Sequence, residues 1–506
     1  MASEILNVSE LKELKNIFDK LKIHLNHEKS IDESNQLNNT IPTVNSDILE
    51  SYFQQLLGKI ERYLERSGRS SSEFIKLLTM KASLLYEQAK IKLFYESSIE
   101  EAKGMLQSTL ELIENYSEHD YVIFLYLRIV NHLSYLLSKE GKFSDARQLL
   151  ENILYREYSP NIAVYSTEDL FSLEQINAEA GKAKFNKLML NNIQMLGWIY
   201  GKLGFNDLHA FMEHLYLQKQ LDLRDMSILH WTSKCCRLVT IYLTSYNWLY
   251  ARYYLASIGA LLNKKSGEPR ANAELPQARA DLSKAWIHYG LHLFSASKKR
   301  LLEQIYDSSG NENSPSDGSK PALDVLDQHK FKGLTVTIPN IPINFITETQ
   351  EARTLFLFTQ NWLKQMRAFY TLRDYPLQYV NAVLDLSELY RFLAFYETDL
   401  ESQYNVQKRR SDTLEALSTL LREVRPNCYV AVSVELWREL AEVQIELMGI
   451  NLKRLYAFEG EKENAGNIKK RLDAVEEVHD KLETIGDSVE LTRRNISRVQ
   501  EKQELR

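Results

Sequence analysis

The stretch that decides the fold spans residues 351–370 and reads EARTLFLFTQNWLKQMRAFY. Its large apolar residues recur three or four positions apart, at Leu355, Phe358, Trp362 and Met366. This spacing places them on one face of a helix. A second apolar series follows Tyr375-Pro376, where proline pushes the preceding residue out of the helical region. Two helices joined by a few residues form an antiparallel hairpin, so the stretch predicts stacked helices and shows no catalytic constellation.

Composition extends this prediction to the whole chain. The protein has 506 residues, of which 44% are hydrophobic, 18 are glycine and 10 are proline. Average usage would give roughly twice as many glycines and more than twice as many prolines. Because both residues punctuate structure, their scarcity predicts long helices and few tight turns. The length fits about three domains, and it fits a single helical solenoid equally well.

The charge balance and the cysteines exclude several classes of protein. A net charge of −6, from 62 basic and 68 acidic residues, disfavours nucleic acid and anionic membranes as partners. The three cysteines (Cys235, Cys236 and Cys428) offer no disulfide framework, and the adjacent pair is interpreted as core filler in preference to a redox pair. The N-terminus lacks a signal-peptide pattern, and no apolar run approaches the ~20 residues of a membrane span. We therefore expect a cytoplasmic protein without membrane insertion.

Internal repetition indicates the kind of helical fold. The first copy of the pattern consists of Leu133, Ser134, Leu137, Gly141, Ala146 and Leu150. A second copy has Leu196, Gly197, Tyr200 and Gly204, with its alanine displaced by one position to Ala210, and a third has Tyr242, Ala251 and Leu255. Ala146 and Ala251 are 105 residues apart, or three steps of 35, close to the ~34-residue period of a tetratricopeptide repeat. The pattern predicts a solenoid in which a glycine ends the first helix of each hairpin.

A change in composition suggests where the solenoid is interrupted. Residues 306–348 contain Ser308-Ser309-Gly310-Asn311 and four prolines, which is typical of a connection between two bodies. We therefore predict an N-terminal solenoid half over 1–305, a flexible linker loop over 306–348, and a C-terminal half of helical hairpins over 349–460. Residues 461–506 are predicted to form a charged amphipathic helical tail.

The tail keeps a seven-residue apolar register. One series is Val475, Leu482, Val489 and Ile496, and the other is Val478, Ile485, Thr492 and Val499. Four heptads can form a coiled coil, which would let the protein self-associate, although Gly486 and Thr492 weaken this interpretation. The alternative is a long amphipathic helix that lies on the end of the solenoid.

No known catalytic pattern is present. The sequence lacks phosphate-binding glycine loops, the H-E-x-x-H zinc motif and the G-x-S-x-G elbow. His24 and His27 lie near Glu28 without further converging ligands, and paired acids such as Glu397 and Asp399 lie on helices of mixed charge. We expect neither an enzyme nor a site for a metal or cofactor.

Three segments carry a resemblance to a known family. They are Glu351-Ala352-Arg353-x-Leu355-Phe356-Leu357, Leu393-Ala394-Phe395-Tyr396-Glu397-Thr398-Asp399-Leu400-Glu401, and Gln407-Lys408-Arg409-Arg410-x-x-x-Leu414-Glu415. This pattern resembles the KIF-binding proteins, cytosolic factors that bind kinesin motor domains. The resemblance is clearest over residues 351–456, fainter over 188–286 and weak over 1–150. The family continues with more helical pairs where this chain has its heptad tail, so the C-terminal part is expected to be divergent or truncated.

The resemblance implies a fold and a function. The expected fold is all-α, a tetratricopeptide-like right-handed α-solenoid of antiparallel helical hairpins in two halves. Its concave surface would clasp a kinesin motor domain on the face that meets tubulin, which would block attachment to the microtubule. Such a protein would affect axonal transport, microtubule organisation, axon outgrowth and neurogenesis. It would be cytoplasmic and associated with the cytoskeleton, and association with mitochondria is left open.

The resemblance also implies partner-binding residues on the central hairpins. Gln220 matches a polar contact position of the family, and Trp198 and Arg237 stand where the family has other polar residues. Tryptophan and arginine suit the centre of an interface, and ordinary packing is the alternative for each. Lys234 lies one turn from Arg237 and is either a contact or simply an exposed lysine. Two other functions stay open: a generic scaffold for peptide segments, and an accessory subunit of an enzyme.

Overall fold

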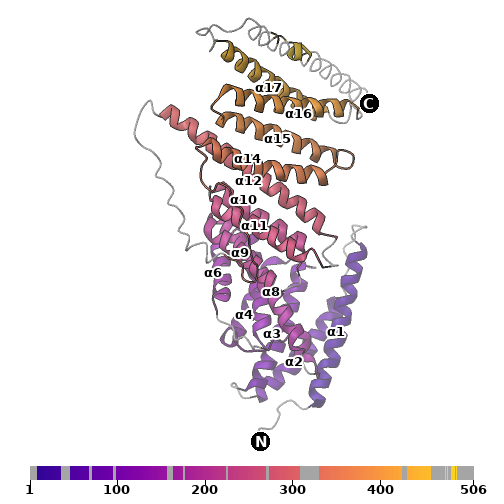
Figure 1. Cartoon of the computed structure of the whole chain (residues 1–506). Coiled ribbons are helices and arrows are strands. Elements are labelled where there is room, and N and C mark those ends of the chain that lie inside the picture. Colours follow the sequence, from indigo (N-terminus) through magenta and orange to yellow (C-terminus); the bar gives the residue numbers. More distant parts are fainter. Residues whose placement is uncertain are drawn as a thin grey trace. The chain divides into compact units, whose positions relative to one another are not determined.

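The structure is a computed structural model, and all regular secondary structure in its described residues is helical (Figure 1). This confirms the expected all-α solenoid. The described residues are 8–35, 46–67, 71–94, 98–156, 163–174, 177–223, 226–268, 273–307, 330–423 and 430–456, together with 473, 476, 480–484 and 486.

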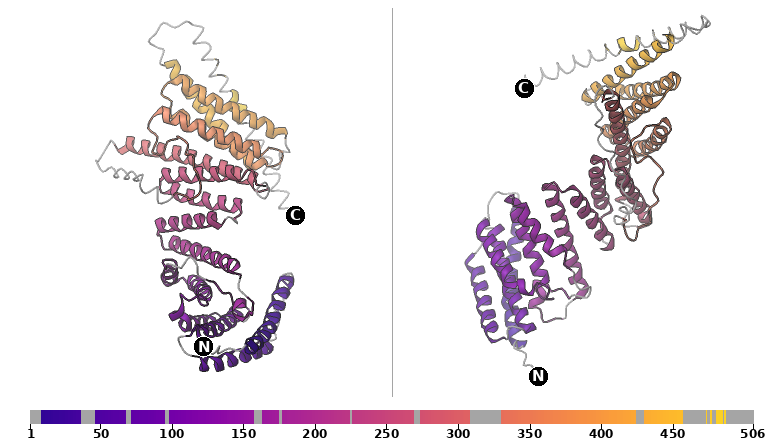
Figure 2. Two further views of the ribbon diagram at one scale, coloured as in Figure 1. Left: turned by 60° about the horizontal axis from the view of Figure 1, so that its bottom comes forward. Right: turned by 90° about the vertical axis from the view of Figure 1, so that its left-hand side faces the viewer.

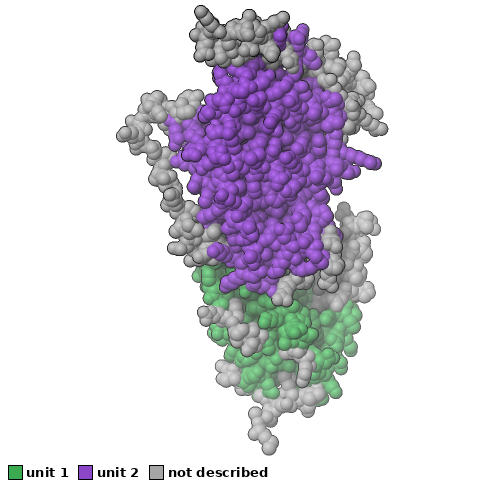
Figure 3. Space-filling view, in the orientation of Figure 1, with its two compact units in different colours: residues 1–220 green, residues 221–506 purple. Residues whose placement is uncertain are grey.

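The chain separates into two compact units, residues 1–220 and residues 221–506 (Figure 3). This division lies within the expected N-terminal half, and the domain boundaries drawn from the sequence stay a prediction. The two units are described separately below.

The helices described in the first unit are α1 Val8–Asn35, α2 Ser46–Arg66, α3 Ser72–Phe94, α4 Ile99–Ile113, α5 Ile123–Lys139, α6 Phe143–Leu154, α7 Thr167–Phe171, α8 Ala178–Lys202 and α9 Asn206–Leu223, whose last residues fall in the second unit. The helices from α1 to α6 each contact the next, α6 also contacts α8, and the short α7 contacts α1 and α3. Helix α3 is apolar on both sides, because Leu77 and Leu84 join one core with α1 and α2 while Ala82 and Tyr86 join another with α5 and α8.

The repeat pattern corresponds to a turn that recurs in three hairpins. In α5–α6 and α8–α9 the turn contains Gly141 and Gly204, which have φ angles of 79° and 81°. The next residue donates its backbone N–H to a carbonyl five positions earlier, from Lys142 to Leu137 at 2.9 Å and from Phe205 to Tyr200 at 2.9 Å. This is the glycine-ended helix terminus that the sequence predicted.

The third hairpin makes the same turn without glycine. It joins α10 (Ile228–Thr244) to α11 (Trp248–Lys265), and Tyr246 takes the left-handed position with φ of 56°. Asn247 N donates to Tyr242 O at 2.8 Å. A left-handed tyrosine is strained, and its ring is held against Trp248 and Phe345 at centroid distances of 6.0 and 5.8 Å.

The displaced alanine of the second repeat also has a physical explanation. His209 occupies the position where the other hairpins have alanine, and its Nδ1 lies 2.7 Å from the carbonyl oxygen of Gly197. A side chain at Gly201 would meet the His209 ring at 3.6 Å. The His209 ring thus packs beside Gly197 and Gly201 of α8, at a position where the other two hairpins carry alanine.

The second unit continues with helices that each contact the next in chain order. Besides α10 and α11, these are α12 Leu275–Asp307, α14 Thr349–Phe369, α15 Pro376–Tyr396, α16 Leu400–Glu423 and α17 Val430–Tyr456. Helices α14 to α17 lie side by side in the views of Figures 1 and 2. Pro376 is at the start of α15, which confirms the break expected at Tyr375-Pro376.

Helices α12 and α14 approach each other closely at a glycine. A Cβ atom on Gly290 would lie 2.1 Å from Thr359 Oγ1 and 2.9 Å from Thr359 Cγ2. Thr359 is buried and donates its hydroxyl to the Leu355 carbonyl at 2.9 Å. Glycine is therefore required at position 290 by the space between the helices.

The second part of the expected linker, residues 330–348, is packed onto α11 and α12. Arg252 Nη1 donates to the carbonyl of Ile341 at 3.1 Å, and Tyr289 Oη donates to the carbonyl of Pro342 at 2.7 Å. Ile346 N donates to Ser297 Oγ at 2.9 Å, and the Ile346 side chain is fully buried. This irregular segment is thus fixed by side chains that bind its backbone, while residues 308–329 lie outside the described residues.

Only a small part of the predicted tail is described. Residues 480–484 are helical, Leu482 packs against the core formed by α15, α16 and α17, and Lys481 Nζ lies 3.1 Å from Glu415 on α16. These contacts agree with a helix that packs on the end of the solenoid. The other heptad positions, and with them the coiled coil, lie outside the described residues.

Candidate partner-binding surface

The four residues expected to bind a partner fall into two pairs, one in each unit. In the first unit, Trp198 on α8 is 46% exposed. Gln220 on α9 is half-buried and donates from Nε2 to Tyr216 Oη at 3.1 Å. Its Oε1 is buried and has no hydrogen bond within the described residues. The Trp198 ring is thus accessible to a partner, and Gln220 Oε1 is an acceptor without a donor in the described part of the chain.

The second pair lies on α10, and only one of its members is at the surface. Arg237 is exposed, whereas Lys234 is only 6% exposed. The alternative that Lys234 is simply an exposed lysine is therefore wrong, because its position on α10 faces the interior. Partner contacts by either residue stay a prediction.

Trp198 belongs to an exposed aromatic cluster on α6 and α8. Its ring meets Phe143 edge-on at 5.7 Å, and Lys202 Nζ lies 5.6 Å from its centroid. One turn further along α6, the guanidinium of Arg147 lies 5.8 Å from the ring of Phe205, which is 43% exposed. We call Phe143, Trp198, Phe205, Arg147 and Lys202 the α6–α8 aromatic cluster.

This cluster has the chemistry of an interface centre. Aromatic residues and arginine are enriched where proteins bind one another and carry much of the binding energy. The cations lie over aromatic rings, which favours them by roughly 0.5–1 kcal/mol at exposed sites. The sequence identified Trp198 but missed the others, because they lie up to 62 positions apart and only the fold brings them together.

Two arginines of the family-like segments, in contrast, form ion pairs within the chain. Arg353 donates from Nε and Nη2 to the two carboxylate oxygens of Glu397, at 2.9 and 2.6 Å. This two-bond pair connects the start of α14 to the end of α15. The Glu397 side chain is buried, whereas the Arg353 side chain is 49% exposed, so the pair holds the hairpin at its surface.

The third segment contributes an arginine to a buried ionic network. Arg410 on α16 is fully buried, donates from Nη2 to Glu439 Oε2 at 2.6 Å, and donates from Nε to Ser387 Oγ at 2.9 Å. Glu442 and Glu446 lie 3.5 and 3.6 Å from its guanidinium nitrogens. The network joins α15, α16 and α17.

Burial and ion pairing oppose each other at Glu439. Burial disfavours the charged carboxylate, but hydrogen bonds and charge from Arg410, with help from Ser387, hold the pKa of Glu439 below its ordinary value. At Glu446 burial prevails and raises the pKa. The network is therefore built around the pair of Arg410 and Glu439.

The described residues contain no group of three histidine, cysteine or acidic side chains able to hold a metal ion. Cys235 is fully buried, and burial raises its pKa well above the ordinary value. Burial likewise raises the pKa of Cys236 to about 12. Both thiols therefore stay protonated near neutral pH, in agreement with core filling, while Cys428 lies outside the described part of the chain. Among the described helices, none combines the length and apolar character needed to span a bilayer.

A protein-family model matches the second unit of the chain. The family model described as "KIF-1 binding protein C terminal" matches residues 229–477. This range includes all three segments on which the resemblance was based.

Curated proteins agree with the family model. The KIF-binding protein of Xenopus tropicalis is 24% identical over 371 residues, covering 67% of this chain and 60% of that protein. The KIF-binding protein of Gallus gallus is 24% identical over 409 residues, covering 74% and 67%. That of Drosophila melanogaster is 23% identical over 424 residues, covering 80% and 69%. The chain thus spans about 60% to 69% of the length of these relatives.

Two solved structures are similar at low scores. A circular tandem repeat protein with a novel repeat topology has a TM-score of 0.25 and 13% identity, covering 95% of this chain and 98% of that one. The APC/C hetero-tetramer Cut9-Hcn1 has a TM-score of 0.24 and 12% identity, covering 89% and 84%.

Proposed function

We propose that this chain is a member of the KIF-binding protein family, to which it is similar, and that it binds kinesin motor domains and regulates their attachment to microtubules. The match over residues 229–477 carries the proposal. The relatives it resembles are named for binding KIF proteins. The mechanism we propose is competition, in which the bound protein covers the motor surface that would meet tubulin.

Two physical features support this proposal. The α6–α8 aromatic cluster offers exposed rings and cations of the kind that dominate interfaces. The net charge of −6 suits a partner surface that must itself be basic to meet acidic tubulin, since opposite potentials steer association. We place the centre of the contact at Trp198, with Gln220, Arg237 and Lys234 as further candidates.

In cells, motors held off the track would change axonal transport, microtubule organisation and axon outgrowth. Such a protein would act in the cytoplasm next to the cytoskeleton. These consequences rest on the proposed motor binding and follow from it without any catalytic step.

Microtubule pelleting tests the proposal directly. Purified protein is mixed with kinesin motor domains, microtubules and a non-hydrolysable ATP analogue, and motors in pellet and supernatant are quantified. We expect motors to move to the supernatant in a soluble complex with this protein. Motors that pellet as before, with no complex formed, would contradict motor binding and favour a generic scaffold for peptide segments.

A substitution in the aromatic cluster locates the contact. Trp198→Ala is expected to weaken motor binding by about 30-fold or more, since a central aromatic anchor contributes about 2 kcal/mol or more. Phe395→Ala is a matched control, because Phe395 on α15 is 37% exposed and has Lys298 Nζ 5.1 Å from its ring. Equal motor affinity in both folded variants would discard the cluster as the contact site.

A further inference from the structure

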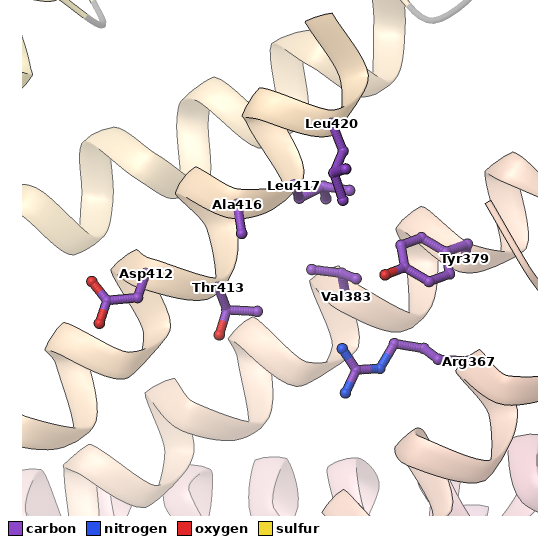
Figure 4. Close-up of a pocket in the computed structure, with 8 residues that line it drawn as sticks. All are labelled: Arg367, Tyr379, Val383, Asp412, Thr413, Ala416, Leu417 and Leu420. Atoms are coloured by element: carbon purple, nitrogen blue, oxygen red, sulfur yellow. The ribbon is translucent and has the colours of Figure 1, made fainter. Parts of the chain in front are cut away.

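A groove in the second unit lies between α14, α15 and α16 and is separate from the aromatic cluster. It has a volume of about 350 Å³ and is open to solvent. Its lining residues are Arg367, Tyr379, Val383, Asp412, Thr413, Ala416, Leu417 and Leu420 (Figure 4). A volume of this size is at the lower end of ligand-binding pockets, about 300–1,000 Å³.

The groove combines an apolar surface with one arginine. Val383, Leu417 and Leu420 supply its apolar part, and Leu420 is among the exposed large apolar residues of the chain. In Figure 4 the guanidinium of Arg367 and the hydroxyl of Tyr379 extend toward Val383 from the same side of the groove. An apolar side chain and an anionic group could therefore be bound next to each other.

Arg367 has no partner within the part of the chain that the structure describes. Its Nε is buried without a hydrogen bond. The carboxylate that lines the same groove, Asp412, is paired with Lys408 at 3.6 Å. The guanidinium of Arg367 is therefore not engaged by an acceptor of the described residues, and a ligand carboxylate could bind its accessible nitrogens.

Charge near the groove also favours an anion. Lys364 lies one turn before Arg367 on α14, and Arg409 lies one turn before Asp412 and Thr413 on α16, and both side chains are exposed. Residues three or four apart on a helix are neighbours. The planar fork of an arginine matches a carboxylate with two parallel hydrogen bonds.

We infer that this groove binds an acidic peptide segment of a partner protein. A glutamate or aspartate of the segment binds Arg367, and an adjacent leucine-sized side chain packs on Val383, Leu417 and Leu420. A phosphate dianion fits less well, because the groove offers one cation and an Asp412 carboxylate beside an apolar surface. The site is independent of the proposed motor contact and would let the protein bind a second partner.

Selection from a random peptide library displayed on phage tests the inference with the full chain. We expect enriched peptides to contain an acidic residue within a few positions of a leucine, isoleucine or phenylalanine. The same selection against Arg367→Gln should lose them. Absence of enrichment, enrichment of peptides without an acidic residue, or equal enrichment on both proteins would overturn the inference.

Fluorescence anisotropy with one selected, labelled peptide then measures each contribution. Arg367→Gln should weaken binding by about tenfold or more, and Leu420→Ser by several-fold, since desolvated anchors dominate binding. Lys364→Gln is the control for general charge and should change the affinity by about twofold or less, as expected of a rim charge. Changing the peptide glutamate to glutamine should reproduce the loss of affinity seen with Arg367→Gln. If the two losses add up when the changed peptide is measured against Arg367→Gln, the peptide carboxylate does not bind Arg367.

Thermal melts and motor binding complete the test. Arg367→Gln should melt within about 2 °C of the unsubstituted protein, since it removes no bond within the described residues. Motor pelleting should be unchanged by Arg367→Gln, so a failure of motor binding and a failure of the groove are distinguishable. A variant that loses peptide binding only because it unfolds would be revealed by the melt, and Leu420→Ser then gives the independent result.

Discussion

Replacing Arg410 is the most informative perturbation of the fold. The side chain is 0% exposed, and it connects α16 to Glu439 on α17 and Ser387 on α15, at 2.6 and 2.9 Å. Arg410→Met keeps a similar length and removes the charge. The variant leaves Glu439 buried with the Ser387 hydroxyl at 3.0 Å, the exposed Arg438 at 3.1 Å and Arg391 at 4.0 Å.

The expected loss follows from what stays behind. Removing one partner of a buried ion pair costs about 3–5 kcal/mol when the remaining charge is uncompensated. Arg438 and Arg391 still face Glu439 in this variant, so we expect a loss near the lower figure, about 3 kcal/mol. At about 2–4 °C per kcal/mol for a large unit, the melting temperature of the second unit should fall by roughly 6–12 °C. Glu442 and Glu446 add to the loss, since both lie within 3.6 Å of the same guanidinium.

Calorimetry with a neighbouring control measures this effect. Arg409→Met removes an exposed arginine from the adjacent position and should shift the melting temperature by about 2 °C or less. Hydrogen exchange should increase in α15, α16 and α17 in Arg410→Met. The double variant Arg410→Met/Glu439→Gln should recover part of the loss, because removing both partners costs less than removing one.

One result would refute this reasoning. If Arg410→Met melted at the same temperature as Arg409→Met, the buried pair would make no net contribution and packing alone would hold the three helices together. Equal losses in the single and double variants would likewise show that the carboxylate of Glu439 is not the group that Arg410 stabilises.

Two further predictions concern close packing and pH. Gly290→Ala should lower the free energy of unfolding by about 1–3 kcal/mol, the usual cost of overpacking, because its methyl group would collide with Thr359. Adding Thr359→Ala should restore most of the lost stability in urea titrations. If the second substitution restores nothing, the strain lies elsewhere. Burial, with the nearby charge of Glu388, raises the pKa of Asp385 to about 6 from 3.8, so ionisation of this carboxyl lowers stability as the pH rises through 6. Asp385→Asn should therefore be more stable than the unsubstituted protein by about 1–3 kcal/mol at pH 7, with no gain in stability below about pH 4. If thermal melts showed a gain of equal size at both pH values, titration of Asp385 would be excluded as its cause.

The helices were predictable because their physical cause is local. Apolar residues at helical spacing, as in α14, and a proline at the start of α15 are visible in the sequence. The turns at Gly141 and Gly204 were visible for the same reason, since glycine adopts positive φ without strain. The left-handed conformation of Tyr246 could not be predicted, because local preference disfavours it and packing against Trp248 and Phe345 holds it in place.

The features that sequence reasoning missed depend on neighbours far along the chain. In residues 330–348 the apolar residues do not recur at helical or strand spacing, and the side chains that fix the backbone of this segment lie on α11 and α12. Lys234 was predicted at the surface because helical spacing cannot tell which face of α10 is covered. The aromatic cluster likewise exists only after α6 and α8 have packed together.

The pairing of Arg353 with Glu397 and of Arg410 with Glu439 has a consequence for how the similarity to other proteins is interpreted. Both arginines stand in the segments that carry the resemblance, and both connect helices of this chain to one another. The exposed residues around Trp198 take no part in these pairs, so they can change without disturbing them. Similarity at the paired positions therefore reports a shared helical framework, and what the chain binds has to be sought in the residues that face solvent.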